Sequence, residues 1–107
     1  MKVTARFTAG KLWLGLKGEL DHHGAREGMS IIKSRIEELY PRDCMLDLSE
    51  VSFMDSSGIA IILRTYKLMH ELDGRLWIEN VPPQPMKVID AAGIERLVGI
   101  TALANKE

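Results

Sequence analysis

The chain has 107 residues, with 14 Lys and Arg against 15 Asp and Glu. This length predicts one domain, spanning residues 1–107, that buries a single core without a deep enclosed active site. The balanced charge argues against a nucleic-acid partner, and no apolar stretch approaches the roughly 20 residues of a membrane span. Cys44 is the single cysteine and lies in an apolar run, so we expect a buried thiol. With no signal-peptide pattern at the start, the expected location is the cytoplasm.

Side-chain character alternates along residues 2–9 and 11–18, which is typical of strands. The stretch "AGK" at residues 9–11 predicts a hairpin turn between them. A first helix is expected over residues 22–40, with Asp21 as its N-cap. Its apolar residues recur with the helical period and predict one face packed on a sheet: Ala25, Met29, Ile32, Ile36 and Leu39.

The following segment alternates strand and helix signals. The apolar run 44–49 predicts a central strand, and residues 56–73 predict a second helix, with Gly74 in its C′ position. Another strand is expected over residues 75–80.

A third helix should open at Pro85 and stop at Gly93. The resulting order is β-β-α-β-α-β-α. Strand–helix–strand crossovers bring successive strands into parallel register, and the initial hairpin adds an antiparallel pair. We therefore expect an α/β domain with a small mixed sheet of four to five strands, flanked by helices.

Polar residues follow the second and third strands. "DHH" at residues 21–23 follows one, and "DSS" at residues 55–57 follows the other. Because parallel strands present their carboxyl ends at one edge of a sheet, Asp21 and Ser56 become candidate neighbours. That edge is where open α/β sheets usually carry their sites.

The second helix has a wide apolar surface. Arg64, Lys67 and Glu71 form only a narrow polar wedge. A helix on a sheet needs an apolar stripe somewhat over about 100° wide, so the extra width around Ile61 has to be covered. Either a neighbouring helix of the same domain or a partner protein could cover it.

Four chemical interpretations of "DSSG" and "DHH" compete. A helix cap explains Asp55 or a serine, although a cap needs only one such residue. A hydrolase would need a base such as His22 or His23 beside Ser56, yet the sequence is not the G-x-S-x-G elbow. A two-metal phosphoesterase would need more ligands than "DHH" supplies, so we expect no metal site.

A phosphate acceptor fits better. A phosphate adds about 1.5 to 2 negative charges, which a helix N-terminus accommodates through its free N–H groups and dipole. Beside Asp21 and Asp55, the same charges would make the edge strongly anionic. A partner fitted to the unmodified edge would lose charge complementarity while the fold stays intact.

Three stretches carry a resemblance: "GELDHH" at residues 18–23, "LDLSEVSFMDSSGIAIILRTYK" at 46–67 and "VIDAAGI" at 88–94. They resemble the STAS-domain anti-sigma factor antagonists of bacteria, over nearly the whole chain. "ELDHH" is more similar to the sporulation branch than to the general-stress branch. Ala60 departs from the family pattern, which often has glycine there.

The resemblance implies a binding protein that catalyses nothing. Its partners would be an anti-sigma factor that is also a serine kinase, and a PP2C-type serine phosphatase. ATP and the divalent metal would belong to those partners, and this chain would be a monomer without a cofactor. Phosphorylation would end binding to the kinase, and the phosphatase would restore it.

Carried over by position, the resemblance makes Ser56 the phosphorylation site. The partner-binding residues it implies, or that the helix surface adds, lie in three groups: Asp21, His22 and His23; Asp55, Ser57 and Gly58; and Ile61. A STAS module serving a different kinase or signalling complex remains open, as does, with less support, a small serine hydrolase.

Overall fold

The computed structural model describes residues 1–104, which form eight regular elements and one short 3₁₀ helix, η1. In chain order they are β1 Lys2–Thr8, β2 Lys11–Leu20, α1 His22–Leu39, β3 Asp43–Met54, α2 Ser56–Glu71, β4 Arg75–Val81, α3 Pro83–Ala92, η1 Ile94–Arg96 and β5 Gly99–Ala102. None of the helices in this described part is long and apolar enough to cross a membrane.

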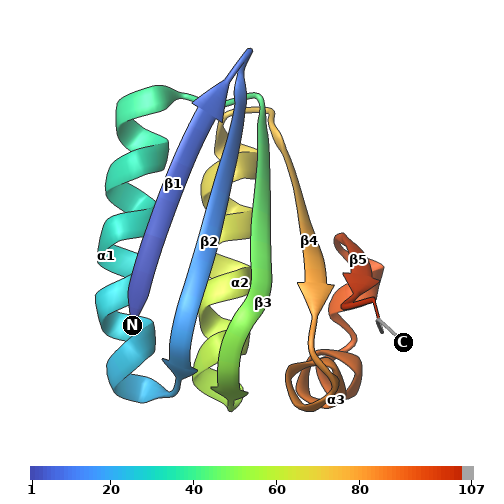
Figure 1. Cartoon of the computed structure of the whole chain (residues 1–107). Coiled ribbons are helices and arrows are strands. Elements are labelled where there is room, and N and C mark those ends of the chain that lie inside the picture. The colour runs from blue at the N-terminus through green and yellow to red at the C-terminus, as the bar shows by residue number, and fades with distance from the viewer. Residues whose placement is uncertain (105–107) are drawn as a thin grey trace.

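The five strands form one mixed sheet in the order β1-β2-β3-β4-β5 (Figure 1). β1 and β2 pair antiparallel, and every other neighbouring pair is parallel. Ala9 and Gly10 both have positive φ, 51° and 81°, as a tight two-residue hairpin requires. The predicted α/β class, mixed sheet and parallel pairing are confirmed.

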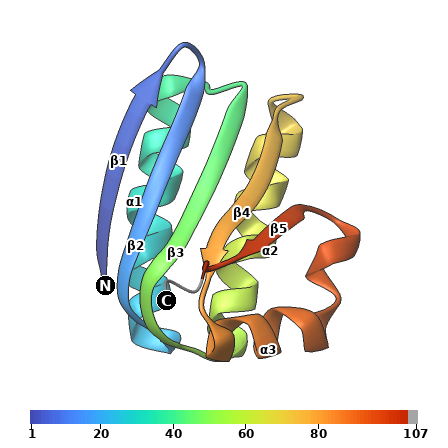
Figure 2. The same cartoon turned by 45° about the vertical axis from the view of Figure 1, so that its right-hand side comes forward.

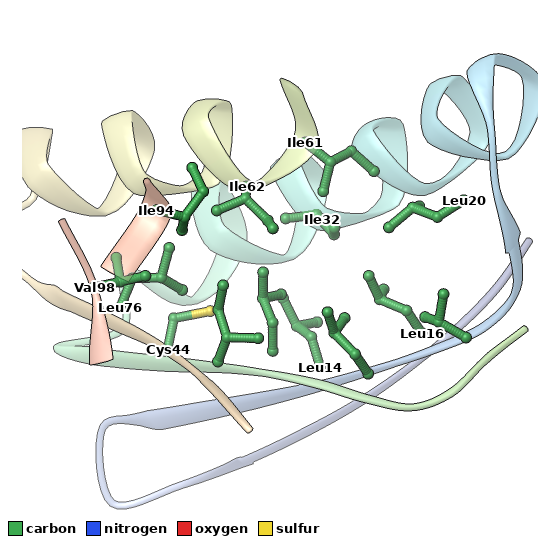
Figure 3. Close-up of a cluster of buried hydrophobic side chains, with 14 of the residues drawn as sticks. Leu14, Leu16, Leu20, Ile32, Cys44, Ile61, Ile62, Leu76, Ile94 and Val98 are labelled. Carbon is green, nitrogen blue, oxygen red and sulfur yellow. The ribbon is translucent and has the colours of Figure 1, made fainter. Parts of the chain in front are cut away.

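The helices α1 and α2 lie on one face of the sheet, and no helix of residues 1–104 lies on the opposite face (Figure 2). Alternate β2 residues point into the layer between sheet and helices, where Leu12, Leu14 and Leu16 are at most 1% exposed. Ile32 of α1 and Ile62 of α2 meet them there (Figure 3). The buried residues of β2, β3 and β4 thus fix which way the residues of these three strands face.

Most of the wide apolar surface of α2 is covered within the chain, although Leu63 remains 41% exposed. α1 packs alongside α2, Ile61 is 2% exposed, and Leu68 and Leu72 are partly buried against the core. Of the two explanations left open by the sequence, the neighbouring helix is the one observed.

Two boundaries near the sheet differ from the prediction. β3 continues beyond the apolar run 44–49 to Met54, because it pairs with β2 as far as Leu20 despite two register shifts. α2 ends at Glu71, and the left-handed residue after it is Asp73, with φ 55°, rather than Gly74. Gly74 is required for another reason: a Cβ there would lie 2.8 Å from the Arg42 carbonyl oxygen.

The C-terminal third also differs in detail. α3 begins at Pro83 rather than Pro85. A proline is tolerated in the first turn, because the N–H groups there have no helical partner to lose. Gly93 ends the helix as predicted, with φ 68°. The tail then adds β5 to the edge of β4. Its four residues carry little periodic signal of their own, so the order extends to β-β-α-β-α-β-α-β.

Candidate partner-binding rim

The first polar junction, residues 21–24, connects β2 to α1. Asp21 is the N-cap of α1, and its Oδ1 accepts a hydrogen bond from the Gly24 N–H at 2.8 Å. Gly24 is buried in the first turn, where a Cβ would overlap the Glu19 carbonyl oxygen. The chain therefore needs both the capping carboxylate and the glycine to enter the helix here.

The second junction, residues 55–58, repeats this arrangement between β3 and α2. Asp55 is the N-cap, with its Oδ1 accepting from the Ser57 N–H at 2.8 Å. Gly58 is buried against Met54, and a Cβ there would lie 2.5 Å from the Met54 Cγ. Both junctions thus have the pattern Asp-x-x-Gly, with histidines in the middle of the first and serines in the middle of the second.

A backbone hydrogen bond joins the two junctions. The Asp55 N–H donates to the Leu20 carbonyl oxygen at 3.4 Å, directly before Asp21. The ends of β2 and β3 also lie at the same end of the sheet in both views (Figures 1 and 2). The structure therefore brings Asp21 and Ser56, which are far apart in the sequence, to one edge of the sheet. We call this edge, formed by residues 21–24 and 55–58, the rim.

The first turn of α3 is attached to the second junction through Gln84. Its Oε1 accepts from the Met54 N–H at 2.9 Å, and its Nε2 donates to the Met54 carbonyl oxygen at 2.8 Å. This side chain replaces a strand neighbour at the end of β3, immediately before Asp55. Sequence reasoning missed Gln84, because "VPPQP" shows only a helix start.

The two serines occupy different surroundings. Ser56 is exposed at the first position of α2, and within residues 1–104 its hydroxyl makes no hydrogen bond. Ser57 is half-buried and lines a groove of about 190 Å³ between α1 and α2, together with Arg26 and Arg64. Ile61 also lines this groove while being 2% exposed. Ser56 is thus the more accessible hydroxyl.

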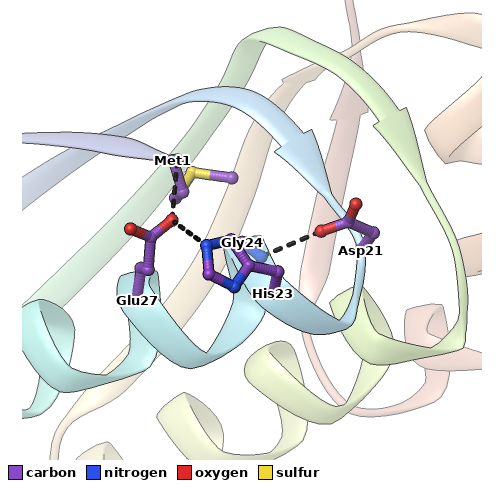
Figure 4. Close-up of polar contacts among 5 residues, drawn as sticks. All are labelled: Met1, Asp21, His23, Gly24 and Glu27. Atoms are coloured by element: carbon purple, nitrogen blue, oxygen red, sulfur yellow. Dashed lines mark hydrogen bonds and ion pairs between the residues drawn. The ribbon is translucent and has the colours of Figure 1, made fainter.

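The two histidines point in different directions. His22 lines the groove between the helices, near Ser57. His23 faces Glu27, with its Nε2 3.8 Å from the Glu27 Oε1, which also contacts the Met1 amino group at 3.1 Å (Figure 4). No group of three or more His, Cys, Asp or Glu residues that could hold a metal occurs in the part of the chain described.

Among the described residues, Asp21 and Cys44 have pKa values that differ from their ordinary values. The hydrogen bond from the Gly24 N–H, helped by His23, lowers the pKa of Asp21 below 3.8, because it stabilises the carboxylate. Burial raises the pKa of the Cys44 thiol to about 12. The rim thus keeps an ionised Asp21, while Cys44 remains a buried neutral thiol, as expected from the sequence.

With this geometry established, comparison with known proteins assigns the family. The STAS domain model matches residues 2–106. The chain belongs to the STAS domain family. The resemblance drawn from the three sequence stretches is thereby confirmed.

Two curated relatives carry the name of anti-sigma factor antagonists. An anti-sigma F factor antagonist of Paenibacillus polymyxa is 33% identical over 94% of this STAS chain and 86% of its own. An anti-sigma-B factor antagonist of Bacillus subtilis (strain 168) is 23% identical over 95% and 92% of the two chains.

Solved structures share the fold. The anti-sigma factor antagonist SpoIIAA in its unphosphorylated form superposes with a TM-score of 0.79 at 24% identity, covering 98% of this chain and 90% of its own. The phosphorylated form of the Bacillus SpoIIAA gives 0.71 at the same identity, over 98% and 93%. At this identity the likeness establishes the fold.

Proposed function

We propose that this STAS domain, spanning residues 1–107, is an anti-sigma factor antagonist switched by phosphorylation of Ser56. The unphosphorylated form binds an anti-sigma factor serine kinase and so releases its sigma factor, in the cytoplasm. The chain is the kinase's substrate and competitor, not an enzyme. The observation that carries the proposal is the exposed Ser56 hydroxyl at the rim that carries both capping aspartates.

The comparisons support this assignment in two ways. The Paenibacillus relative is named an anti-sigma F factor antagonist, which favours the sporulation branch. SpoIIAA, which has the same fold, is known in unphosphorylated and phosphorylated forms. A fold that exists in both forms is compatible with a surface switch.

The local structure explains why a phosphate at Ser56 would leave the fold intact. Its hydroxyl has no hydrogen bond to lose among the described residues, and the Asp55 cap engages the next N–H along the helix. The N-terminus of α2 favours negative charge through its dipole and free N–H groups. Phosphorylation should therefore change the surface and not the packing.

The same phosphate would weaken partner binding. It would place about 1.5 to 2 negative charges beside Asp55 and across the rim from Asp21. The pKa of Asp21 is already lowered, so this carboxylate stays ionised at neutral pH. A kinase fitted to the unmodified rim meets added bulk and mismatched charge, and it dissociates. A PP2C-type phosphatase would then restore the binding form.

Mass spectrometry after incubation with the cognate kinase and ATP tests the site. We expect one phosphate on Ser56, none in Ser56→Ala, and normal modification in the matched Ser57→Ala variant. Ser56→Asp should keep the thermal stability of the parent and lose kinase binding. Phosphate on Ser57, or normal phosphorylation of Ser56→Ala, would refute the assignment. Ester hydrolysis that disappears in Ser56→Ala would support the hydrolase instead.

A further inference from the structure

The face of the sheet without helices carries a row of large side chains. Strand register aligns Arg6 with Trp13, Trp13 with Met45, and Met45 with Trp77, across four neighbouring strands. We call these four residues the tryptophan row. They point away from the helices, because the residues on either side of them along β2, β3 and β4 are buried in the core.

The tryptophan row has the composition of a protein interface. Both tryptophans of the chain belong to it. The Arg6 Cζ lies 4.2 Å from the centroid of the Trp13 ring, and Met45 is only 8% exposed although no helix of residues 1–104 covers it. Trp13 lies close over Gly15, where a Cβ would be 2.5 Å from the indole. Trp, Arg and Met are the residues enriched where proteins bind one another.

Charge is distributed unevenly across this face. Two ion pairs, Lys17 with Glu50 and Arg75 with Asp43, are satisfied within the chain. Apart from Glu19 at the end of β2, the charges on this face that form no ion pair within residues 1–104 then separate by strand. Lys2, Arg6 and Lys11 lie on β1 and β2, whereas Asp47 and Glu79 lie on β3 and β4. One half of the face is basic and the other is acidic.

We propose that this face is a self-association surface, on which a second copy of the chain packs about a two-fold axis parallel to the strands. Such an axis places β4 of one copy over β1 of the other, and β3 over β2. A two-fold axis across the strands would instead set the basic strands against each other. The charge pattern therefore selects one arrangement.

Individual side chains match in that arrangement. An axis parallel to the strands keeps each residue at the same position along the strand direction. Glu79 of the second copy therefore lies over Thr4, between Lys2 and Arg6. Trp77 of the second copy meets Arg6 beside a hollow of about 270 Å³ lined by Arg6, Thr8, Lys11, Trp13 and Met45. Every such contact occurs twice by symmetry.

The size of the face sets the expected strength. Four strands of about seven residues cover roughly 450 Å² per copy at the usual strand spacing and rise. Standard stable interfaces bury about 800 Å² per partner. We therefore expect a weak, reversible dimer that forms with rising concentration, and a monomer in dilute solution.

Intrinsic fluorescence and sedimentation velocity test the dimer together. Because both tryptophans lie on this face, the emission should shift to shorter wavelength over the same concentration range in which the sedimentation coefficient rises. The proposal would be overturned if the chain stayed monomeric up to the millimolar range. The same holds if its emission shifted only when a different protein was added.

Charge reversal tests the arrangement. Arg6→Glu and Glu79→Lys should each weaken self-association by about tenfold, because each dimer then opposes like charges twice. An equimolar mixture of the two should form a heterodimer with opposite charges at both contacts and recover most of the affinity. Lys33→Glu, the same kind of change on α1, is the matched control and should behave as the parent. Unchanged association in Arg6→Glu, or no recovery in the mixture, would refute this face.

Discussion

The two junctions at the rim have nearly the same architecture and different chemistry. In both, an aspartate in an extended conformation caps a helix, and a buried glycine three residues later allows the close approach of the chain. Histidines fill the first junction and serines fill the second. Helix capping therefore explains both aspartates, and close packing explains both glycines. Neither explains the choice between histidine and serine, and that choice carries the proposed switch.

Exchanging the middle residues gives the largest expected effect. A Ser56→His/Ser57→His variant retains Asp55 and Gly58, so it should fold with the parent's circular dichroism spectrum and accept no phosphate from the kinase. The reverse change, His22→Ser/His23→Ser in a Ser56→Ala background, should not restore phosphorylation. Incorporation of labelled phosphate measures both. Restored incorporation would mean that capping geometry alone directs the kinase.

The two glycines should differ in their tolerance of alanine. At Gly24 the added Cβ meets the Glu19 backbone, which cannot move away, so Gly24→Ala should lower the free energy of unfolding by about 2 kcal/mol. At Gly58 it meets the Cγ, Sδ and Cε atoms of Met54, a buried side chain that must repack but, unlike backbone, can change rotamer. The helix propensity of alanine offsets part of that strain, so Gly58→Ala should cost about 1 kcal/mol, less than Gly24→Ala. Urea unfolding compares them, and equal losses would contradict this distinction.

Gln84 supports the second junction only. Gln84→Met removes both hydrogen bonds to Met54 while retaining a similar volume, and we expect a loss of about 1 kcal/mol. Amide hydrogen exchange should accelerate at Met54 and Asp55 and stay unchanged at Gly24. Lys87→Met, on the exposed side of α3, is the matched control. Unchanged exchange at Met54 would show that these bonds contribute little.

The smallest effect concerns the pH dependence of the first junction. Because the folded state lowers the pKa of Asp21, this carboxylate stabilises the fold above about pH 3.8. That contribution is lost as the pH falls through the lower, folded-state pKa. Asp21→Asn should therefore show a flatter decline of melting temperature between neutral and acid pH. An unchanged profile would indicate that Asp21 does not contribute to acid sensitivity.

Local sequence patterns predicted most of the fold. Alternation along β1 and β2, the helical periods of α1 and α2, and the breakers between them place the elements to within a few residues. Parallel connection then predicts that Asp21 and Ser56 share a rim, and the bond from Asp55 to Leu20 brings their loops together. The roles of these residues in partner binding remain predictions.

What the pattern could not supply depends on contacts between distant segments. The end of β3 is extended by pairing with β2, β5 exists because β4 offers an unpaired edge, and Gln84 binds Met54 across 30 residues. The tryptophan row likewise arises only when four strands are set in register. Sequence period determines which residues of one element face together. Beyond the parallel pairing that the connections predict, tertiary structure decides which elements meet, because hydrogen bonds and packing between them follow no local period.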